Sequence, residues 1–191
     1  GACMAEIGHQ VKLVDANLQK LTTLKKGRMP FYEPGMKELV LRNVKRRRLA
    51  FTTSMKEAVE HGVVIFLCVG TPPRPDGEAD LTAVENVAQE IGRVMHNYRL
   101  IVEKSTVPVE TGMWIKRTIE ANVRRGKAEY DVASNPEFLR EGAAIQDFMR
   151  PDRIVLGVES KRAERILREL YKTFDAPLVV TDIRSAEMIK H

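Results

Sequence analysis

The sequence predicts an α/β protein built on a doubly wound, mostly parallel sheet, and three observations support this fold class. Short apolar segments alternate along the chain with segments whose apolar residues recur at helical spacing. The apolar run "VVIFLCVG" at Val63–Gly70 is continuous, as expected for a strand buried on both faces. Gly, Pro and polar residues gather directly after several apolar segments, where such sheets bind their ligands.

The strands and helices follow from these patterns in chain order. The predicted strands are His9–Asp15, Leu49–Thr53, Val63–Gly70, Leu100–Ser105, Tyr130–Ser134, Arg153–Gly157 and Pro177–Thr181. A helix is predicted after Asp80, its expected N-cap, because apolar residues recur at helical spacing as far as Met95. Ala163–Leu170 repeats this pattern. Because no internal repeat or linker interrupts the alternation, we predict a single domain.

Composition is typical of an ordinary globular protein that does not span a membrane. The chain has 191 residues, of which 43% are hydrophobic and 30% charged. It contains no apolar run of about 18 residues, and its first residues do not resemble a secretory signal. Cys3 and Cys68 are too few for a disulfide framework, which favours a cytoplasmic location, and we expect both to be buried core residues. The net charge of +5 favours anionic ligands such as nucleotides.

The basic cluster "KRRR" at Lys45–Arg48 has two interpretations. It ends a predicted helix, where cations complement the helix dipole. The alternative is a nucleic-acid patch or a targeting signal, which the absence of interleaved aromatic residues disfavours.

Asp15 ends the first predicted strand. In dinucleotide-binding folds an acidic residue at this place binds the ribose hydroxyls, about 20 residues after a Gly-rich phosphate loop. Fourteen residues precede Asp15 here, and no G-x-G-x-x-G occurs among them. We therefore expect that the chain begins inside the first crossover helix, which Gly8 would end. Alternatively, Asp15 caps a helix that starts near Asn17.

Two further loops follow predicted strands. "VGTPPRPDG" at Val69–Gly77 is either a plain surface turn or a loop that lets the backbone approach a ligand. In "EKSTVPV" at Glu103–Val109, Pro108 is expected near the first turn of a helix. Ser105 or Thr106 either caps that helix or positions a water or a nicotinamide group.

The segment "SNPEFLREG" at Ser134–Gly142 follows the fifth predicted strand and carries Glu137 and Glu141. Acidic residues four apart often form a solvated helix face. At the end of a strand in this fold class, they are also candidates for catalysis.

Together these segments resemble the nucleotide-sugar 6-dehydrogenases of the UDP-glucose/GDP-mannose dehydrogenase family. The matching stretches are "GACMAEIGHQVKLVD", "FYEPGMKELV", "FTTSMKEAV", "VGTPPRPDGEADL", "KSTVPVETG", "SNPEFLREGAAIQDFMRPDRIVLG" and "TDIRSAEMIKH". They occur in the family's order and cover nearly the whole chain. The run "REGAAIQDFMRPDRIVLG" at Arg140–Gly157 looks more like the members that act on UDP-glucose than those that act on GDP-mannose or N-acetylmannosamine.

The resemblance implies a Rossmann-like NAD-binding fold and a four-electron oxidation. The family oxidises the C6 alcohol of UDP-glucose to the carboxylate of UDP-glucuronate with two NAD+ in succession. A cysteine thiolate captures the aldehyde, and water then hydrolyses the thioester. Such chemistry requires a nicotinamide site, a positioned water with a base, and a cation near the developing oxyanion.

The family's roles carry over residue by residue. By resemblance, Asp15 binds the ribose with Lys20 beside it, Thr71 and Thr106 contact the cofactor, and Thr106 also holds the catalytic water. Glu137 resembles the general base and Glu141 a cofactor contact. Lys190 resembles the lysine that binds substrate and stabilises the oxyanion. The predicted wall of the sugar-nucleotide pocket is Glu137, Phe138, Leu139, Arg140 and Glu141. No metal is implied.

Four departures from the family pattern are clear. The glycine fingerprint is absent, and the asparagine expected one turn after Lys190 would lie beyond His191. The nucleophilic cysteine belongs to a second nucleotide-sugar domain, and neither Cys3 nor Cys68 matches its context. Glu110 stands where the family often has glycine. We therefore interpret residues 1–191 as part of an N-terminal NAD-binding domain, without the central and C-terminal UDP-sugar-binding domains.

Two alternatives stand beside UDP-glucose oxidation. One is a sister enzyme that acts on GDP-mannose or UDP-N-acetylmannosamine. The other is a non-catalytic nucleotide-binding module, which the joint presence of Thr106, Glu137, Glu141 and Lys190 disfavours because a binding module needs no base. As partners we expect a nucleotide sugar and, in the full-length parent, further copies of the same protein, but neither nucleic acid nor membrane.

Overall fold

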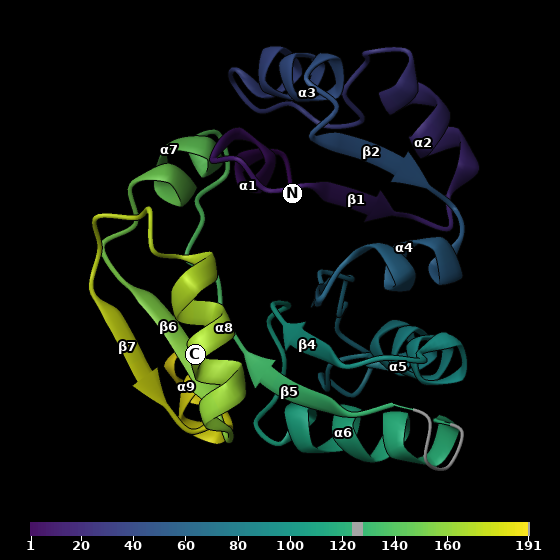
Figure 1. Cartoon of the computed structure of the whole chain (residues 1–191), viewed down its shortest axis with the longest axis vertical. Helices are drawn as coiled ribbons and strands as arrows, with labels where there is room; N and C mark the ends of the chain where they lie inside the picture. Colours follow the sequence, from purple (N-terminus) through teal and green to yellow (C-terminus); the bar gives the residue numbers. More distant parts are fainter. Residues whose placement is uncertain (124–127, 191) are drawn as a thin grey trace. The chain divides into compact units, whose positions relative to one another are not determined.

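A computed structural model describes residues 1–123 and 128–190 of the chain. The chain divides into two compact units, one formed by Gly1–Gly62 and Leu139–Asp152, the other by Val63–Phe138 and Arg153–His191. The predicted α/β class with a mostly parallel sheet is confirmed (Figure 1). The strands, however, form a two-stranded and a five-stranded sheet rather than the single sheet that we predicted. Within the described residues, every helix is too short or too polar to cross a membrane.

The first unit is built on two parallel strands. Its elements are α1 (Ala2–Glu6), β1 (Val11–Val14), α2 (Leu18–Lys25), α3 (Met36–Lys45), β2 (Leu49–Thr52), α4 (Met55–His61) and α7 (Ala144–Met149). In the parallel pairing, Val11 lies opposite Leu49. Apolar residues of α1, α3 and β2 form the core of this unit, including the predicted buried Cys3. Gly8 ends α1 as predicted: its φ is +113°, and its amide donates to the carbonyl of Ala5.

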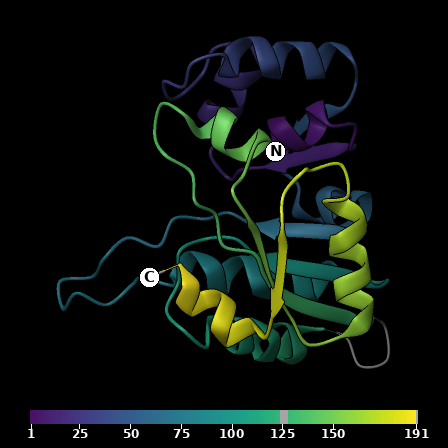
Figure 2. The ribbon, with the colours of Figure 1, turned by 90° about the vertical axis from the view of Figure 1, so that its left-hand side faces the viewer.

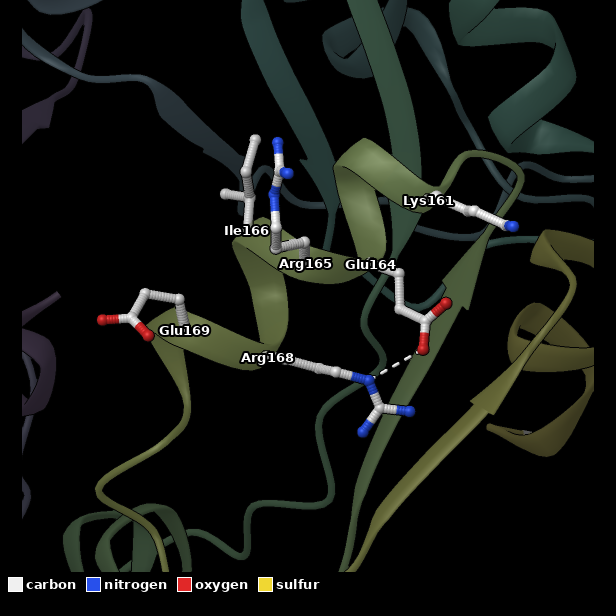
Figure 3. A pocket seen from close by; sticks show the side chains of 6 residues that line it. All are labelled: Lys161, Glu164, Arg165, Ile166, Arg168 and Glu169. Carbon is white, nitrogen blue, oxygen red and sulfur yellow. Dashed lines mark hydrogen bonds and ion pairs between the residues drawn. The ribbon is translucent and has the colours of Figure 1, made fainter.

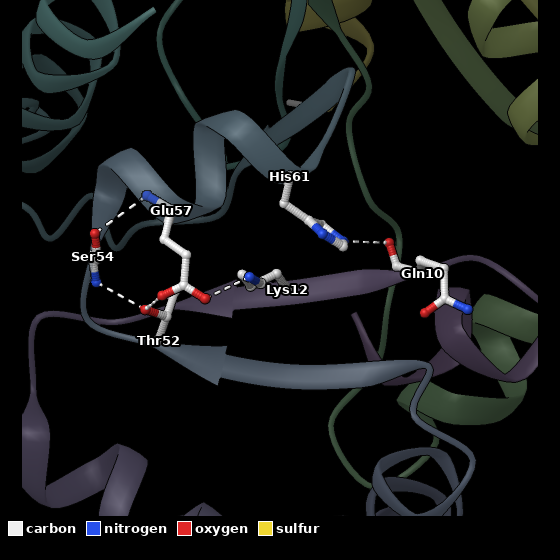
Figure 4. A network of polar contacts seen from close by, with 6 residues as sticks. All are labelled: Gln10, Lys12, Thr52, Ser54, Glu57 and His61. Atoms are coloured by element: carbon white, nitrogen blue, oxygen red, sulfur yellow. Dashed lines mark hydrogen bonds and ion pairs between the residues drawn. The ribbon is translucent and has the colours of Figure 1, made fainter.

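A polar network fastens α4 to the two strands of this unit (Figure 4). The carboxylate of Glu57 accepts from Lys12 Nζ at 2.5 Å and from Thr52 Oγ1 at 2.6 Å. Ser54 caps α4 by accepting from the Glu57 amide. The hydrogen bond from Lys12, followed by the one from Thr52, lowers the pKa of Glu57. One carboxylate therefore links β1, β2 and α4.

The second unit holds the larger sheet. Its elements are β3 (Val64–Leu67), α5 (Thr82–Val94), β4 (Arg99–Glu103), α6 (Thr111–Asn122), β5 (Tyr130–Ser134), β6 (Ile154–Val158), α8 (Lys161–Leu170), β7 (Leu178–Thr181) and α9 (Ile183–Ile189). The strand order is β3-β4-β5-β6-β7, and every neighbouring pair is parallel except β5 and β6. Helices α8 and α9 lie on opposite sides of β6 and β7 (Figure 2).

The prediction for the apolar run Val63–Gly70 was wrong in two respects. The strand covers only Val64–Leu67, and of these residues only Leu67 is fully buried. Cys68 follows the strand and is exposed rather than a core residue. The physical reason is the sheet order, because β3 lies at one end of the five-stranded sheet, whereas β4 lies between β3 and β5 and is buried throughout.

Two predicted helix starts also differ. The N-cap of α5 is Leu81 rather than Asp80, whose carboxylate accepts from the Thr82 amide. Helix α6 begins at Thr111, three residues after Pro108, and its N-cap is Glu110. Neither Ser105 nor Thr106 is therefore the N-cap of α6.

Two other choices left open by the sequence are decided locally in the first unit. Asn17 rather than Asp15 is the N-cap of α2, because its side chain accepts from the Lys20 amide. The cluster "KRRR" does end a helix, since α3 stops at Lys45 and Arg47 adopts a positive φ of 56°.

Within the second unit, one buried carboxylate and two glycines allow helix α9 to pack against its neighbours. Glu187 accepts from the backbone amides of Glu110 at 2.7 Å and Gly112 at 2.6 Å, at the start of α6. A Cβ added at Gly112 would lie 2.6 Å from the Ile183 side chain, and one at Gly157 would lie 2.5 Å from Cβ of Ala186. Only residues without a side chain allow α9 to approach α6 and β6 this closely.

Glu103 is a second buried carboxyl group, at the end of β4. It is 1% exposed, and its Oε1 has no hydrogen-bond partner within the described chain. Burial raises the pKa of Glu103 to about 8, and Glu187 adds to the rise, whereas Ser105 and Lys104 oppose it. Glu103 is therefore largely protonated in the folded protein near neutral pH.

We expect Glu103→Gln to flatten the dependence of stability on pH. Below the pKa of the unfolded carboxyl group, near 4.5, Glu103 is neutral in both states. As the pH rises towards about 8, the unfolded chain ionises while the folded one resists, so the wild type loses stability by up to about 1.4 kcal/mol per unit of pH. Urea unfolding at several pH values between these limits measures the effect. An equal loss of stability in both proteins would contradict the assignment.

We expect Glu110→Gly to stabilise the fold. Glu110 has a φ of 81°, in the left-handed region that favours glycine, which gives a physical reason for the glycine common at this place in the family pattern. Relief of this strain is worth about 1 kcal/mol. The lost ion pair with Arg184 is exposed and contributes little. Glu110→Ala is the control, because it removes the ion pair but keeps the strain; equal stability of the two variants would argue against this explanation.

Candidate functional site

The carboxyl ends of three parallel strands carry the predicted site residues of the second unit. Thr71 follows β3, Thr106 follows β4 and Glu137 follows β5. Because these strands are neighbours in the order β3-β4-β5, their ends meet at one edge of the sheet. Of the four residues expected to share one rim because they follow strands, Asp15, Thr71, Thr106 and Glu137, the last three therefore lie at one edge of the five-stranded sheet. Asp15 follows β1 and lies on the rim of the two-stranded sheet instead.

Glu137 and Lys190 are in direct contact. Lys190 Nζ donates to the backbone carbonyl of Glu137 at 2.6 Å and lies 3.0 Å from the carboxylate oxygen Oε1. Both side chains are about three-quarters buried, with exposed fractions of 29% and 20%. The fold thus brings together a carboxylate and an ammonium group that lie 53 residues apart in the sequence.

Neither predicted glutamate lies on a helix face. Residues 135–140 have no regular structure, and Glu141 begins a turn that precedes α7. The interpretation of Glu137 and Glu141 as a solvated helix surface is therefore wrong.

Phe138 lies next to the pair formed by Glu137 and Lys190. Arg153 Cζ lies 4.6 Å from the centre of its ring, and Lys190 Nζ lies 5.7 Å away. Both distances are within the range of cation–π attraction. The predicted wall residue Phe138 therefore has two cations close to its ring.

The loops that follow β3 and β4 are joined by side-chain hydrogen bonds. Thr71 Oγ1 donates to the carbonyl of Thr106 at 2.7 Å, and Ser105 Oγ donates to the carbonyl of Val69 at 2.8 Å. Beyond Thr71 the chain forms an exposed narrow loop, closed by a bridge between Pro73 and Ala79, which extends from the sheet in Figure 2. Thr71 and Thr106 are thus held together.

A buried amide behind Glu137 was missed by the sequence analysis. Asn135 is 2% exposed; its Oδ1 accepts from Tyr171 at 2.6 Å and from Lys104 Nζ at 3.0 Å. Its Nδ2 donates to the carbonyl of Val155 at 2.9 Å. The one available signal was positional, because Lys104 and Asn135 directly follow neighbouring strands. Nothing in the sequence around Tyr171 pointed to this contact.

In the first unit, Asp15 and Lys20 form the predicted pair. Lys20 Nζ lies 2.5 Å from Asp15 Oδ2, and the Asn17 amide donates to Oδ1. The hydrogen bond from Lys20 is the main reason that the pKa of Asp15 is lowered. Asp15 therefore presents an ionised, partly exposed carboxylate directly after β1.

Residues Leu139–Gly142 of the first unit are fixed by two carboxylates that the sequence analysis did not predict. Arg140 makes a two-pronged contact with Asp147, whose pKa this contact lowers to about 2. Glu33 accepts from the amides of Gly142 and Ile145, at 3.0 and 3.3 Å. Glu141 lies between these anchors and is exposed.

The predicted residues thus fall into two groups. Asp15, Lys20, Leu139, Arg140 and Glu141 belong to the first unit, and Thr71, Thr106, Glu137, Phe138 and Lys190 belong to the second. In residues 1–123 and 128–190, no group of three or more His, Cys, Asp or Glu side chains is arranged to hold a metal ion.

A hollow elsewhere on the second unit is unrelated to these residues (Figure 3). A single helix, α8, provides its lining, which consists of Lys161, Glu164, Arg165, Ile166, Arg168 and Glu169. Arg168 Nε donates to Glu164 at 2.7 Å, so two of the charges neutralise each other. We therefore place the candidate functional site at the rim of the sheet and not at this hollow.

Comparison with known proteins agrees with this fold. The family model described as "UDP-glucose/GDP-mannose dehydrogenase family, NAD binding domain" matches residues 1–175. A UDP-glucose 6-dehydrogenase of Bacillus subtilis is 45% identical over 191 residues, which cover 100% of this chain and 41% of that protein. The structure of a UDP-glucose dehydrogenase from Pyrobaculum islandicum superposes with a TM-score of 0.95 at 42% identity, covering 99% of this chain and 44% of that one.

A GDP-mannose dehydrogenase from Pseudomonas aeruginosa, solved as a ternary complex, is nearly as similar. Its TM-score is 0.94 at 36% identity, and the match covers 99% of this chain and 44% of that one. The chain thus spans less than half the length of these relatives. Because the family model covers most of the sequence, this chain belongs to the UDP-glucose/GDP-mannose dehydrogenase family, and it matches that family's NAD-binding domain.

Proposed function

We propose that this chain is the NAD-binding part of a longer NAD-dependent UDP-glucose 6-dehydrogenase, which oxidises UDP-glucose at C6 to UDP-glucuronate. The observation that carries the proposal is the contact between Glu137 and Lys190 at the rim of the five-stranded sheet. Oxidation of an alcohol to a carboxylate requires a base that removes protons and a cation beside an oxygen that becomes negative. A carboxylate and an ammonium group in contact can fill these two roles.

Each residue of the second unit has a defined task in this proposal. Glu137 accepts a proton, either from the C6 hydroxyl group or from the water that provides the second oxygen of the product. Lys190 stabilises the oxygen as negative charge develops on it. The Thr106 hydroxyl group orients that water. Two NAD+ molecules, bound one after the other, would each accept one of the two hydrides that leave C6.

The residues present fit part of an NAD+ molecule. An ionised carboxylate at the end of a strand accepts hydrogen bonds from ribose hydroxyl groups, and Asp15 has this position and charge. Lys20 holds Asp15 in place and adds a positive charge beside it. A glycine-rich turn for the pyrophosphate does not occur in residues 1–191.

Two observations support the proposal that residues 1–191 are part of a longer protein. The chain spans 41% to 45% of the curated relatives at 45% and 46% identity. In the usual doubly wound order, the first strand pairs with both the second and the fourth. A chain without that strand has two separate sheets, as found here.

The sugar nucleotide is the finer part of the proposal. Similarity to a GDP-mannose dehydrogenase keeps GDP-mannose as the second candidate. Turnover of the protein encoded by the whole gene, measured with NAD+ and separately with UDP-glucose, GDP-mannose and UDP-N-acetylmannosamine, decides between them. A kcat/KM that is highest for UDP-glucose supports the proposal. A higher kcat/KM for another nucleotide sugar would show that the proposed substrate is wrong. No turnover with any of the three would refute the proposed dehydrogenase activity.

In that protein, Glu137→Gln should slow turnover by about 10²–10⁴-fold, the usual contribution of a general base. The affinity for nucleotide sugar should change little, because the amide keeps the shape of the side chain. Steady-state kinetics with Glu159→Gln as the control measures this effect, since Glu159 pairs with Lys116 away from the rim. Near-normal turnover would move the role of base to another residue, with Glu141 the first candidate.

Residues 1–191 alone should show no dehydrogenase turnover. They lack the phosphate-binding glycines and a cysteine in the family's nucleophile context, so NAD+ should bind weakly and the second oxidation has no nucleophile. Unpaired strand edges should also favour aggregation. Absorbance at the NADH band with UDP-glucose and NAD+, recorded for this chain and for the protein from the whole gene, tests the prediction. Reproducible NADH formation by residues 1–191 would refute it.

A further inference from the structure

Lys104 is the first residue after β4, and its side chain contacts Asn135, the first residue after β5. Lys104 Nζ lies 3.0 Å from Asn135 Oδ1 and 3.3 Å from the Asn135 carbonyl oxygen. The strand register creates this contact, because Glu103 lies opposite Ser134 and the Asn135 amide donates to the Glu103 carbonyl. One ammonium group thus holds both oxygens of Asn135.

Asn135 is the anchor of the segment that carries Glu137. Its side chain is fixed from three directions, by Lys104, by Tyr171 and by the carbonyl of Val155. Only Pro136 separates Asn135 from Glu137, and proline fixes its own φ and restricts the residue before it to extended conformations. A displacement of Asn135 would therefore move Glu137 and its contact with Lys190.

Lys104 also contributes charge at this place. Glu137 favours its charged form and Lys190 opposes it, whereas Glu103 favours it only at a pH at which its own carboxyl group is ionised. Cys68 at the end of β3 is a further titratable neighbour, and Tyr171 reaches the same amide. Desolvation is the main cause that lowers the pKa of Lys104. A cation behind Glu137 favours an ionised carboxylate, the form that a general base needs.

We propose that Lys104 is a positioning residue for Glu137. Its ammonium group fixes the turn at Asn135 and adds positive charge near the contact between Glu137 and Lys190. This inference rests on the proposed function, in which Glu137 is the base.

The test uses Lys104→Met in the protein encoded by the whole gene. The variant keeps most of the side-chain stem but removes the charge and the donors. We expect kcat to fall about 10–100-fold, as for a small displacement of a catalytic group, while KM for the nucleotide sugar changes less. The acidic limb of the kcat–pH profile should move up by about one pH unit, because Glu137 loses a nearby cation.

Three matched variants separate charge from packing. Lys104→Arg keeps the charge and should leave the acidic limb near its wild-type position. Tyr171→Phe removes a hydrogen bond to Asn135 but no charge, so it should lower kcat without moving the limb. Lys116→Met removes a lysine from an exposed pair with Glu159 in the same unit, and it should behave as the wild type.

Each outcome decides the inference. A lower kcat with a shifted limb in Lys104→Met and an unshifted limb in Lys104→Arg supports it. Wild-type kcat, or a lower kcat and thermal midpoint with an unshifted limb, overturns it. If Lys104→Met does not fold, the acidic limb of the kcat–pH profile is measured for Lys104→Gln instead. A limb that moves up supports the inference, and a limb at its wild-type position overturns it. A wild type inactive with all three nucleotide sugars would instead refute the proposed function.

Discussion

The parallel pairing of β3, β4 and β5 is the constraint on which the candidate site depends. Backbone hydrogen bonds continue past the strand ends: the Lys104 amide donates to the Leu67 carbonyl, and the Asn135 amide donates to the Glu103 carbonyl. The residues that follow the three strands are therefore neighbours whatever their side chains. This register makes Lys104 meet Asn135, and it places Thr106 beside the loop that carries Thr71.

The candidate site also requires that the chain return to the edge of the sheet at which β3, β4 and β5 end. After β6, α8 and β7, helix α9 docks through Glu187, Gly112 and Gly157, and Lys190 follows immediately. A carboxylate at the start of α6 satisfies backbone donors that a helix leaves unpaired. Burial of Glu187 and of Glu103 raises both pKa values, so the docking of α9 is linked to protonation.

The geometry explains why the reaction type is better supported than the sugar. The proposed roles of a carboxylate and an ammonium group in contact would suit the oxidation of many primary alcohols to acids, and the same fold occurs in dehydrogenases of UDP-glucose and GDP-mannose at TM-scores of 0.95 and 0.94. Discrimination between sugars depends on side chains that touch the sugar, since a missing hydrogen-bond partner in a dry pocket is costly. Backbone similarity therefore carries little information about the substrate.

The sequence by itself determined the fold class, the order of strands and helices, and the residues that follow each strand, because apolar periodicity and turn residues are local properties. Residue patterns alone left Glu137 and Glu141 between a helix face and catalysis, and only the resemblance assigned them roles. The tertiary structure decided that Glu137 meets Lys190, 53 residues away, and that Asn135, Tyr171, Glu33 and Asp147 fix the loops. It also decided that Cys68 is exposed and that the strands form two sheets. These features depend on long-range pairing and burial, which no local pattern in one sequence encodes.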